Sequence, residues 1–148
     1  MDKELFRKTE AILYDYNNLA LKIELLKAEI KDIEELYKGC GSIGYEERTK
    51  STNKFSSPVE SEVLEKEKKL KILRNILNDH VTLKRRIDIG IKILNNEESI
   101  LLEMKYFSCK KYRWIDIANK ISYNKDYCRK DIRNNVINKM APFISSYI

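Results

Sequence analysis

The sequence predicts an all-α protein in which a long helical hairpin or coiled coil precedes a C-terminal helix-turn-helix module. Only 4 Gly and 2 Pro occur in 148 residues, so the turns that an all-β fold requires are too few. The first 38 residues repeat apolar side chains every seven residues. The last third contains three apolar patterns with helical spacing, and two of them are joined by a very short connection.

Residues 1–38 are predicted to form one N-terminal heptad helix, because residues 4–38 contain no Gly or Pro. Two interleaved series give the alternating steps of four and three that characterise a coiled-coil seam. These series are Leu5, Ile12, Leu19, Leu26 and Ile33, and Thr9, Tyr16, Ile23, Ile30 and Tyr37. We expect a homo-oligomer, a dimer through this helix, although the same seam could equally pack within one chain.

Residues 39–57 are predicted to be a flexible loop, and residues 58–94 a second long helix. The loop contains three of the four glycines, and connections of this length rarely adopt a regular structure. Ser57, Pro58 and Glu60 form the S-x-x-E pattern that typically begins a helix. Apolar residues then recur at helical spacing to Leu94, so the two long helices are expected to pack as antiparallel neighbours.

Residues 95–148 are predicted to form the helix-turn-helix module. Asn95 and Glu98 have the spacing of a capping box at its start. The connection Ser122-Tyr123-Asn124 is long enough only for a tight turn, and Asn124 is a good N-cap for the helix that follows. The three apolar patterns comprise Ile100, Leu101, Met104 and Phe107; Trp114, Ile117, Ala118 and Ile121; and Cys128, Ile132, Val136 and Met140.

The charge distribution indicates that this module binds DNA. Residues 1–40 contain 7 basic and 9 acidic groups, whereas residues 95–148 contain 10 basic and 6 acidic groups. The N-terminal part of a recognition helix, here within residues 125–140, contacts base edges in the major groove, and flanking cations contact phosphates. The candidates for base readout are Lys125, Asp126, Tyr127, Arg129 and Lys130, and those for phosphate contact are Lys110, Lys111, Arg113, Arg133 and Asn134.

The same residues resemble a known family. The stretches from Glu97 to Phe107, from Trp114 to Ala118, from Ile121 to Asn124 and from Tyr127 to Arg129 are similar to region 4 of sigma-70-type factors, and most similar to phage regulators of the ArpU/RinA type. The resemblance implies an activator of phage or prophage late genes that acts at a promoter, with RNA polymerase as a possible partner. Since the turn lacks the glycine often found there, we expect Ser122 or Asn124 to be left-handed.

Two other functions agree with this pattern: a phage DNA-packaging protein of the small-terminase type, and a helical adaptor or inhibitor that binds proteins. An enzyme is not expected, because the sequence contains no catalytic triad, phosphate-binding loop or metal-ligand spacing. We therefore expect no catalytic residues, metal or cofactor. No segment has the length and hydrophobicity of a membrane span, which predicts a cytoplasmic protein without a membrane partner.

Overall fold

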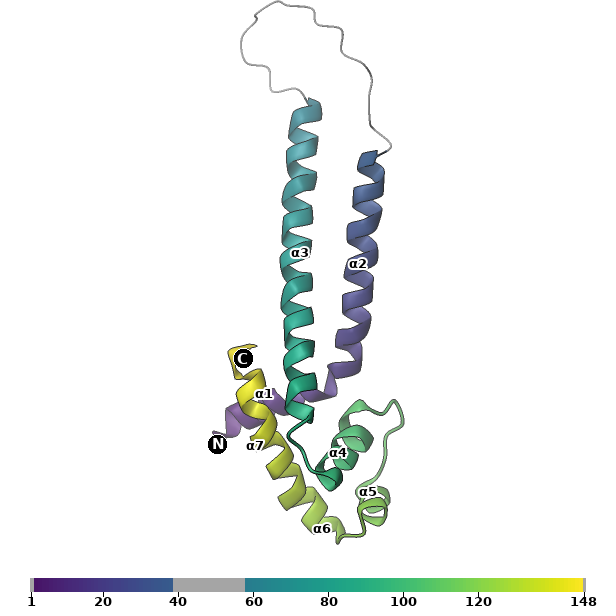
Figure 1. Ribbon diagram of the computed structural model, residues 1–148, viewed down its shortest axis with the longest axis vertical. Coiled ribbons are helices and arrows are strands. Elements are labelled where there is room, and N and C mark those ends of the chain that lie inside the picture. Colours follow the sequence, from purple (N-terminus) through teal and green to yellow (C-terminus); the bar gives the residue numbers. More distant parts are fainter. Residues whose placement is uncertain (1, 39–57, 148) are drawn as a thin grey trace, which may run out of the picture. The chain divides into compact units, whose positions relative to one another are not determined.

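The computed structural model describes residues 2–38 and 58–147, and its regular structure in these ranges is entirely helical (Figure 1). This confirms the predicted all-α class. The helices in chain order are α1 (Lys3–Tyr14), α2 (Tyr16–Lys38), α3 (Pro58–Ile91), α4 (Asn96–Leu102), η1 (Glu103–Phe107), α5 (Trp114–Ile121), α6 (Lys125–Tyr127), η2 (Cys128–Ile132), α7 (Arg133–Ile144) and η3 (Ser145–Tyr147). The predicted loop over 39–57 and the predicted cap at Ser57 lie outside the described residues.

The chain divides into two compact units. One unit, here called the hairpin, comprises residues 23–79. The other, here called the terminal module, joins residues 1–22 to residues 80–148 and thus contains both ends of the chain. Helices α2 and α3 each contribute to both units.

The hairpin pairs the second part of α2 with the first part of α3 in antiparallel directions (Figure 1). Its core is formed by Ile30 of α2 with Leu70 and Leu73 of α3, and Leu26, Ile33 and Leu77 pack around them. The N-terminal heptad stripe of this segment is therefore buried within the chain. Of the two arrangements that the sequence left open, the structure shows the intramolecular one.

The N-terminal segment is two helices rather than the single helix predicted over 4–38, because the helix is interrupted at Asp15. The Asp15 amide donates to the carbonyls of Ala11 and Ile12, and its carboxylate accepts from Asn18 Nδ2 and Lys22 Nζ, both at 2.8 Å. Such local side-chain hydrogen bonds compete with regular helix formation. The flanking rings also have separate partners: Tyr14 packs edge-on against Tyr106, and Tyr16 stacks on Phe107.

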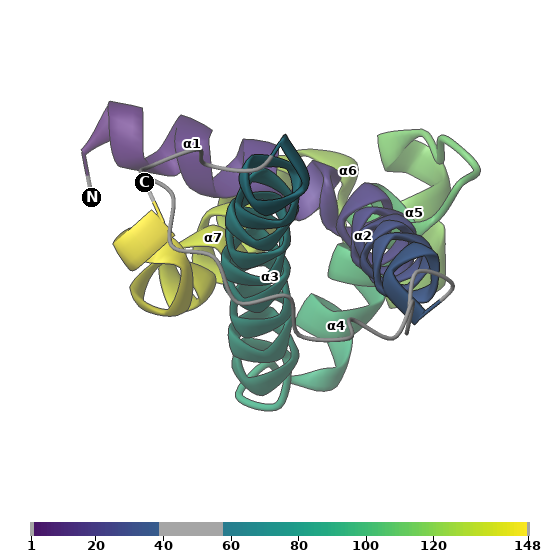
Figure 2. The same ribbon diagram turned by 90° about the horizontal axis from the view of Figure 1, so that it is seen from above.

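The core of the terminal module is formed by α1, the end of α3 and the helices that follow. Helix α1 packs beside α7 (Figure 2), and its residues Thr9 and Leu13 are fully buried. Gly90, near the end of α3, permits a close approach to α7, since a Cβ at this position would lie 2.9 Å from Met140 Sδ. The other fully enclosed side chains include Ile87, Leu101, Leu102, Ile117, Cys128, Val136, Ile137, Met140 and Ile144.

Helix α3 ends at Ile91, three residues earlier than predicted, and Lys92–Leu94 form a turn. The predicted capping box at the start of α4 is confirmed. Asn95 Oδ1 accepts from the Glu98 amide at 2.8 Å, and Glu98 Oε2 accepts from the Asn95 amide at 3.0 Å. These two bonds satisfy amides that the first helical turn leaves without intrahelical partners.

The last predicted helix forms a continuous run of helical backbone from Lys125 to Ile144, widened to a π-helical turn over η2. Its predicted inward stripe is confirmed, because Cys128, Ile132, Val136 and Met140 are all buried. Trp114, the first residue of the second apolar pattern, is only half-buried, and its ring lies under Lys105 Nζ at 4.8 Å.

Candidate nucleic-acid interface

The three-residue connection between α5 and α6 has the predicted tight geometry. Ser122 is left-handed, with φ 63° and ψ 38°, as one of the two alternatives expected from the missing glycine. The amides of Ser122 and Tyr123 both donate to the Ala118 carbonyl, which closes the end of α5. Asn124 Oδ1 then accepts from the Asp126 amide at 2.8 Å, which confirms Asn124 as the N-cap of the next helix.

Buried side chains hold the two helices together beneath this turn. Ile117, Ala118 and Ile121 of α5 and Cys128 and Ile132 of the following helix are all at most 8% exposed. Burial raises the pKa of the Cys128 thiol, in agreement with the predicted role of a small core residue. Because this inner face is closely packed, the outer face of residues 125–130 is held in a fixed orientation.

All five residues predicted for base readout lie on that outer face and are exposed. Three of them, Lys125, Arg129 and Lys130, are cations with no ion-pair partner among residues 2–38 and 58–147. Long side chains that carry an uncompensated positive charge are available to bind an anionic or hydrogen-bond-accepting partner. Asn134 is also exposed, further along the same helix.

Tyr123 was not among the predicted site residues, but the structure places it beside Tyr127. The two ring centroids are 5.4 Å apart, and each side chain is nearly half exposed. Tyr123 lies in the turn before the N-cap Asn124, whereas Tyr127 lies on α6, so the helical spacing of apolar residues did not indicate this contact. The outer face therefore combines cations with an exposed aromatic pair.

The cations predicted to contact phosphates from the loop before α5 are exposed as well. Lys110 and Lys111 lie in this loop, and the Arg113 guanidinium reaches Asp116 Oδ2 at 3.4 Å, which lowers the pKa of Asp116. The loop and the Ser122 turn are at opposite ends of α5, about 12 Å apart for a helix of eight residues. These cations thus form a second group rather than an extension of the first.

Arg133 does not belong to either group, contrary to the prediction of a phosphate contact. Its guanidinium donates to both carboxylate oxygens of Glu10 on α1, at 2.8 and 2.7 Å, and its side chain is mostly buried. Tyr106 also donates to Glu10, at 2.7 Å. Burial alone would raise the pKa of Glu10, but the bonds from Arg133 and Tyr106 outweigh it and lower that pKa. Arg133 therefore connects α7 to α1, a pairing across 123 residues that local sequence patterns could not indicate.

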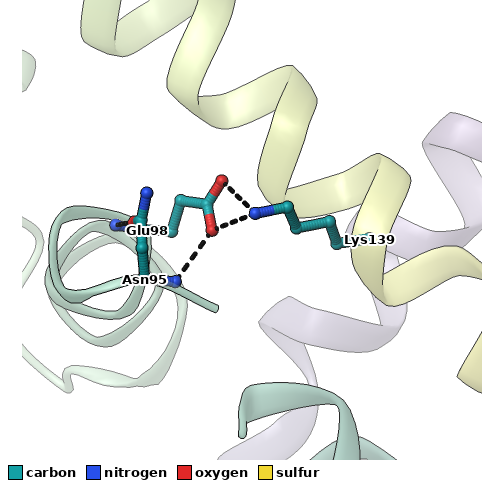
Figure 3. A network of polar contacts seen from close by, with 3 residues as sticks. All are labelled: Asn95, Glu98 and Lys139. Carbon is teal, nitrogen blue, oxygen red and sulfur yellow. Dashed lines mark hydrogen bonds and ion pairs between the residues drawn. The ribbon is translucent and has the colours of Figure 1, made fainter. Parts of the chain in front are cut away.

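A second polar network fixes α4 against α7 (Figure 3). The Glu98 side chain is 4% exposed, and besides completing the capping box it accepts from Lys139 Nζ at 2.8 and 2.7 Å. One buried carboxylate thus joins the start of α4 to the middle of α7. Glu98 also lines a hollow together with Tyr123 and Tyr127, so this network lies beside the candidate site residues.

Other kinds of site receive no support from the part of the chain that the structure describes. Within it, no group of three or more His, Cys, Asp or Glu side chains could hold a metal ion. No helix in the described ranges combines the length and the apolar character needed to cross a bilayer.

Comparison with known proteins identifies a family but no individual relative. The searches of curated proteins and of solved structures returned no match. The family described as "Protein of unknown function (DUF722)" matches residues 5–142, which include α1, the hairpin, the candidate interface and most of α7. Since the match extends over nearly the whole chain, the protein is a member of the DUF722 family.

Proposed function

We propose that this protein is a sequence-specific regulator of transcription that binds double-stranded DNA through a helix-turn-helix formed by α5 and the helix beginning at Lys125. The observation that carries the proposal is the outer face of residues 125–130. It projects three unpaired cations and an exposed tyrosine from a helix whose inner face is closely packed. A helix presented in this way is suited to the major groove, where Arg and Lys donate to guanine and Asn pairs with adenine.

The two groups of cations suggest different roles in the complex. Lys125, Arg129 and Lys130 lie on the outer face of the second helix and are proposed to read bases. Lys110, Lys111 and Arg113 precede the first helix and, with Asn134, are proposed to contact phosphates. Arg133 is left out of this proposal, since its guanidinium is bound to Glu10.

The resemblance to phage regulators of the ArpU/RinA type supports a more specific biological role. We infer activation of late genes of a phage or prophage, in the cytoplasm of the host, with RNA polymerase as a second partner to be tested. A dimer would contact two half-sites, so a symmetric DNA site is expected.

Selection of bound sequences from a random duplex library tests the proposal. The full chain should enrich one motif at near-physiological salt, and Arg129→Ala or Lys130→Ala should each weaken binding to it by about 1–3 kcal/mol. Lys111→Ala should keep the motif but reduce the slope of log K against log salt by about 0.9. Lys27→Ala removes the same charge from the exposed surface of the hairpin and should change neither quantity.

If the folded protein enriches no sequence, the proposal of a sequence-specific regulator is wrong. A ring-shaped oligomer in that case would favour DNA packaging, and loss of all DNA affinity would favour a protein-binding role. Enrichment that is unchanged in both Arg129→Ala and Lys130→Ala would remove these two residues from base readout while leaving DNA binding in place.

A further inference from the structure

We propose that one broad side of the hairpin is the contact surface between two copies of this chain. This surface, here called the Leu25 face, comprises Leu25 and Leu36 of α2 and Ile72 and Ile76 of α3. The core stripe of α2 and α3 is already used within the chain. A dimer therefore requires a different surface from the heptad seam.

The four side chains are large, apolar and exposed. Leu25 is 70% exposed, Leu36 67%, Ile72 59% and Ile76 38%. Leu25 and Leu36 are eleven residues apart, about three full helical turns, so they share one side of α2. Ile72 and Ile76 are four apart and share one side of α3.

An ion pair shows that these two stripes lie on the same side of the hairpin. Lys69 Nζ reaches across to Glu29 Oε1 at 3.3 Å. Glu29 follows Leu25 by four residues, and Lys69 precedes Ile72 by three, so each charged residue lies beside the apolar stripe of its own helix. The bridge between the two helices therefore crosses the Leu25 face.

The opposite side of the hairpin has a different character. A second ion pair, from Arg74 to Glu34 at 2.6 Å, crosses there. Its neighbours at helical spacing are Lys27 and Lys31 on α2 and Glu67 and Lys71 on α3, all exposed and charged. The apolar residue on this side is Leu64, which is seven positions before Lys71. The hairpin thus has one side with mainly charged residues and one side, the Leu25 face, where four large apolar side chains accompany the Glu29–Lys69 ion pair.

The packing of the hairpin by itself leaves its core partly open. Ile30, Leu70 and Leu73 are 8–9% exposed, whereas many core side chains of the terminal module are at 0%. Two helices cannot enclose a side chain from all directions, and layers of helices usually close such a core. The hollow that reaches Leu70 is lined by Glu67, Lys71 and Arg74 on the charged side. A second hairpin laid on the Leu25 face would form a four-helix arrangement and cover the exposed apolar stripes, while leaving this hollow open.

Charge complementarity identifies a second copy as the occupant. A twofold axis parallel to the hairpin places α2 of each copy over α3 of the other. The core cluster of Ile30 with Leu70 and Leu73 sets the antiparallel register. In this register Leu25 lies within a turn of Ile76, and Asp32 within a turn of Lys68, along the hairpin axis. Leu25 of one copy then faces Ile76 of the other, and Asp32 comes opposite Lys68. Neither charge has an ion-pair partner in the described ranges of its own chain.

The test is the mass of the full chain in solution, measured by sedimentation equilibrium without DNA. We expect a dimer at about 10 µM, and the double variant Leu25→Glu with Ile76→Glu should raise the dissociation constant by at least about 100-fold. Both side chains are exposed in the single chain, so circular dichroism should report an unchanged helix content. Leu64→Glu, the matched change on the charged side, should leave the dissociation constant unchanged.

A charge exchange tests the orientation of the two copies. Asp32→Lys and Lys68→Glu should each weaken the dimer when present alone, and a mixture of the two variants should form a heterodimer at least as stable as the wild type. A wild-type chain that stays monomeric at all concentrations would overturn the proposal. A dimer that withstands the double substitution would also overturn it, in favour of another surface. Because DNA is absent, these outcomes are independent of DNA binding.

Discussion

The hairpin and the terminal module are built from similar helices but are held together in different ways. In the terminal module, side chains from six or more segments meet, and many of them are completely enclosed. Its helices are also joined by specific polar networks centred on Glu10 and Glu98. The described part of the hairpin has a single core stripe on each helix, flanked by exposed ion pairs and by the exposed apolar residues of the Leu25 face. The closely packed terminal module can hold a binding surface in a fixed orientation. A pair of long helices is stabilised further when another layer of helices packs against it.

The largest expected effect comes from truncating one core leucine in each unit. Leu101→Ala in the terminal module should reduce the free energy of unfolding by about 3–4 kcal/mol, because the leucine side chain is completely enclosed and its removal leaves a cavity. Leu73→Ala in the hairpin should cost about 2 kcal/mol, because its side chain is less enclosed. Urea denaturation followed by circular dichroism measures both, and hydrogen exchange assigns each loss to its unit. Equal losses would show that the two cores are equally closed in solution.

The next effect concerns the polar connection between α1 and α7. Glu10→Gln should reduce stability at neutral pH by about 2–3 kcal/mol, because Arg133 loses its charged partner in a mostly buried site. The pKa of Glu10 is lowered from its ordinary 4.5, so the ionised carboxylate contributes fully above that pH. The contribution is lost as the pH falls through the lowered folded-state pKa.

Denaturation curves of wild type and Glu10→Gln should therefore converge on acidification below about pH 4.5. Glu4→Gln is the matched control, since Glu4 forms an exposed ion pair with Lys8 on the same helix. It should change stability by less than about 0.5 kcal/mol at any pH. A constant difference between Glu10→Gln and wild type across this range would contradict the assignment of the effect to the charge of Glu10.

The smallest effect comes from the interior of the terminal module. Thr9 is fully buried, and its hydroxyl has no hydrogen-bond partner among residues 2–38 and 58–147. Thr9→Val keeps the shape and removes the unsatisfied polar group, so it should raise stability by up to about 1 kcal/mol. Thr9→Ser keeps the hydroxyl and removes a methyl group, so it should lower stability. A loss in Thr9→Val measured by thermal unfolding would show that the hydroxyl is satisfied in solution.

Local features of the fold could be predicted from the sequence because they depend on neighbouring residues. The Asn95 capping box, the left-handed Ser122, the Asn124 cap and the inward Cys128 stripe all involve side chains within a few positions of each other. The class of the fold and the exposure of Lys125, Asp126, Tyr127, Arg129 and Lys130 followed from the same helical spacing.

Features that depend on distant partners could not be predicted. The interruption at Asp15 coincides with aromatic contacts from its neighbours to Tyr106 and Phe107, about ninety positions away. The pairing of Arg133 with Glu10 gives a basic residue on a basic helix a structural role, and nothing near either residue indicates it. Leu25 and Leu36 could be recognised from the sequence as widening the apolar stripe of this helix, but their exposure outside the core of the hairpin depends on how α3 packs against α2.

The link between Glu10 and Arg133 has a consequence for folding during synthesis. Residue 10 leaves the ribosome on the order of ten seconds before residue 133 at ordinary elongation rates. Throughout that interval α1 has no α7 to pack against, and the hairpin segments, which end at residue 79, are complete before residue 133 is made. We therefore expect the hairpin to form first on the nascent chain and the terminal module to assemble only after α7 has emerged. A chain truncated before α7 would keep its hairpin, but its helix α1 would have no α7 to pack against.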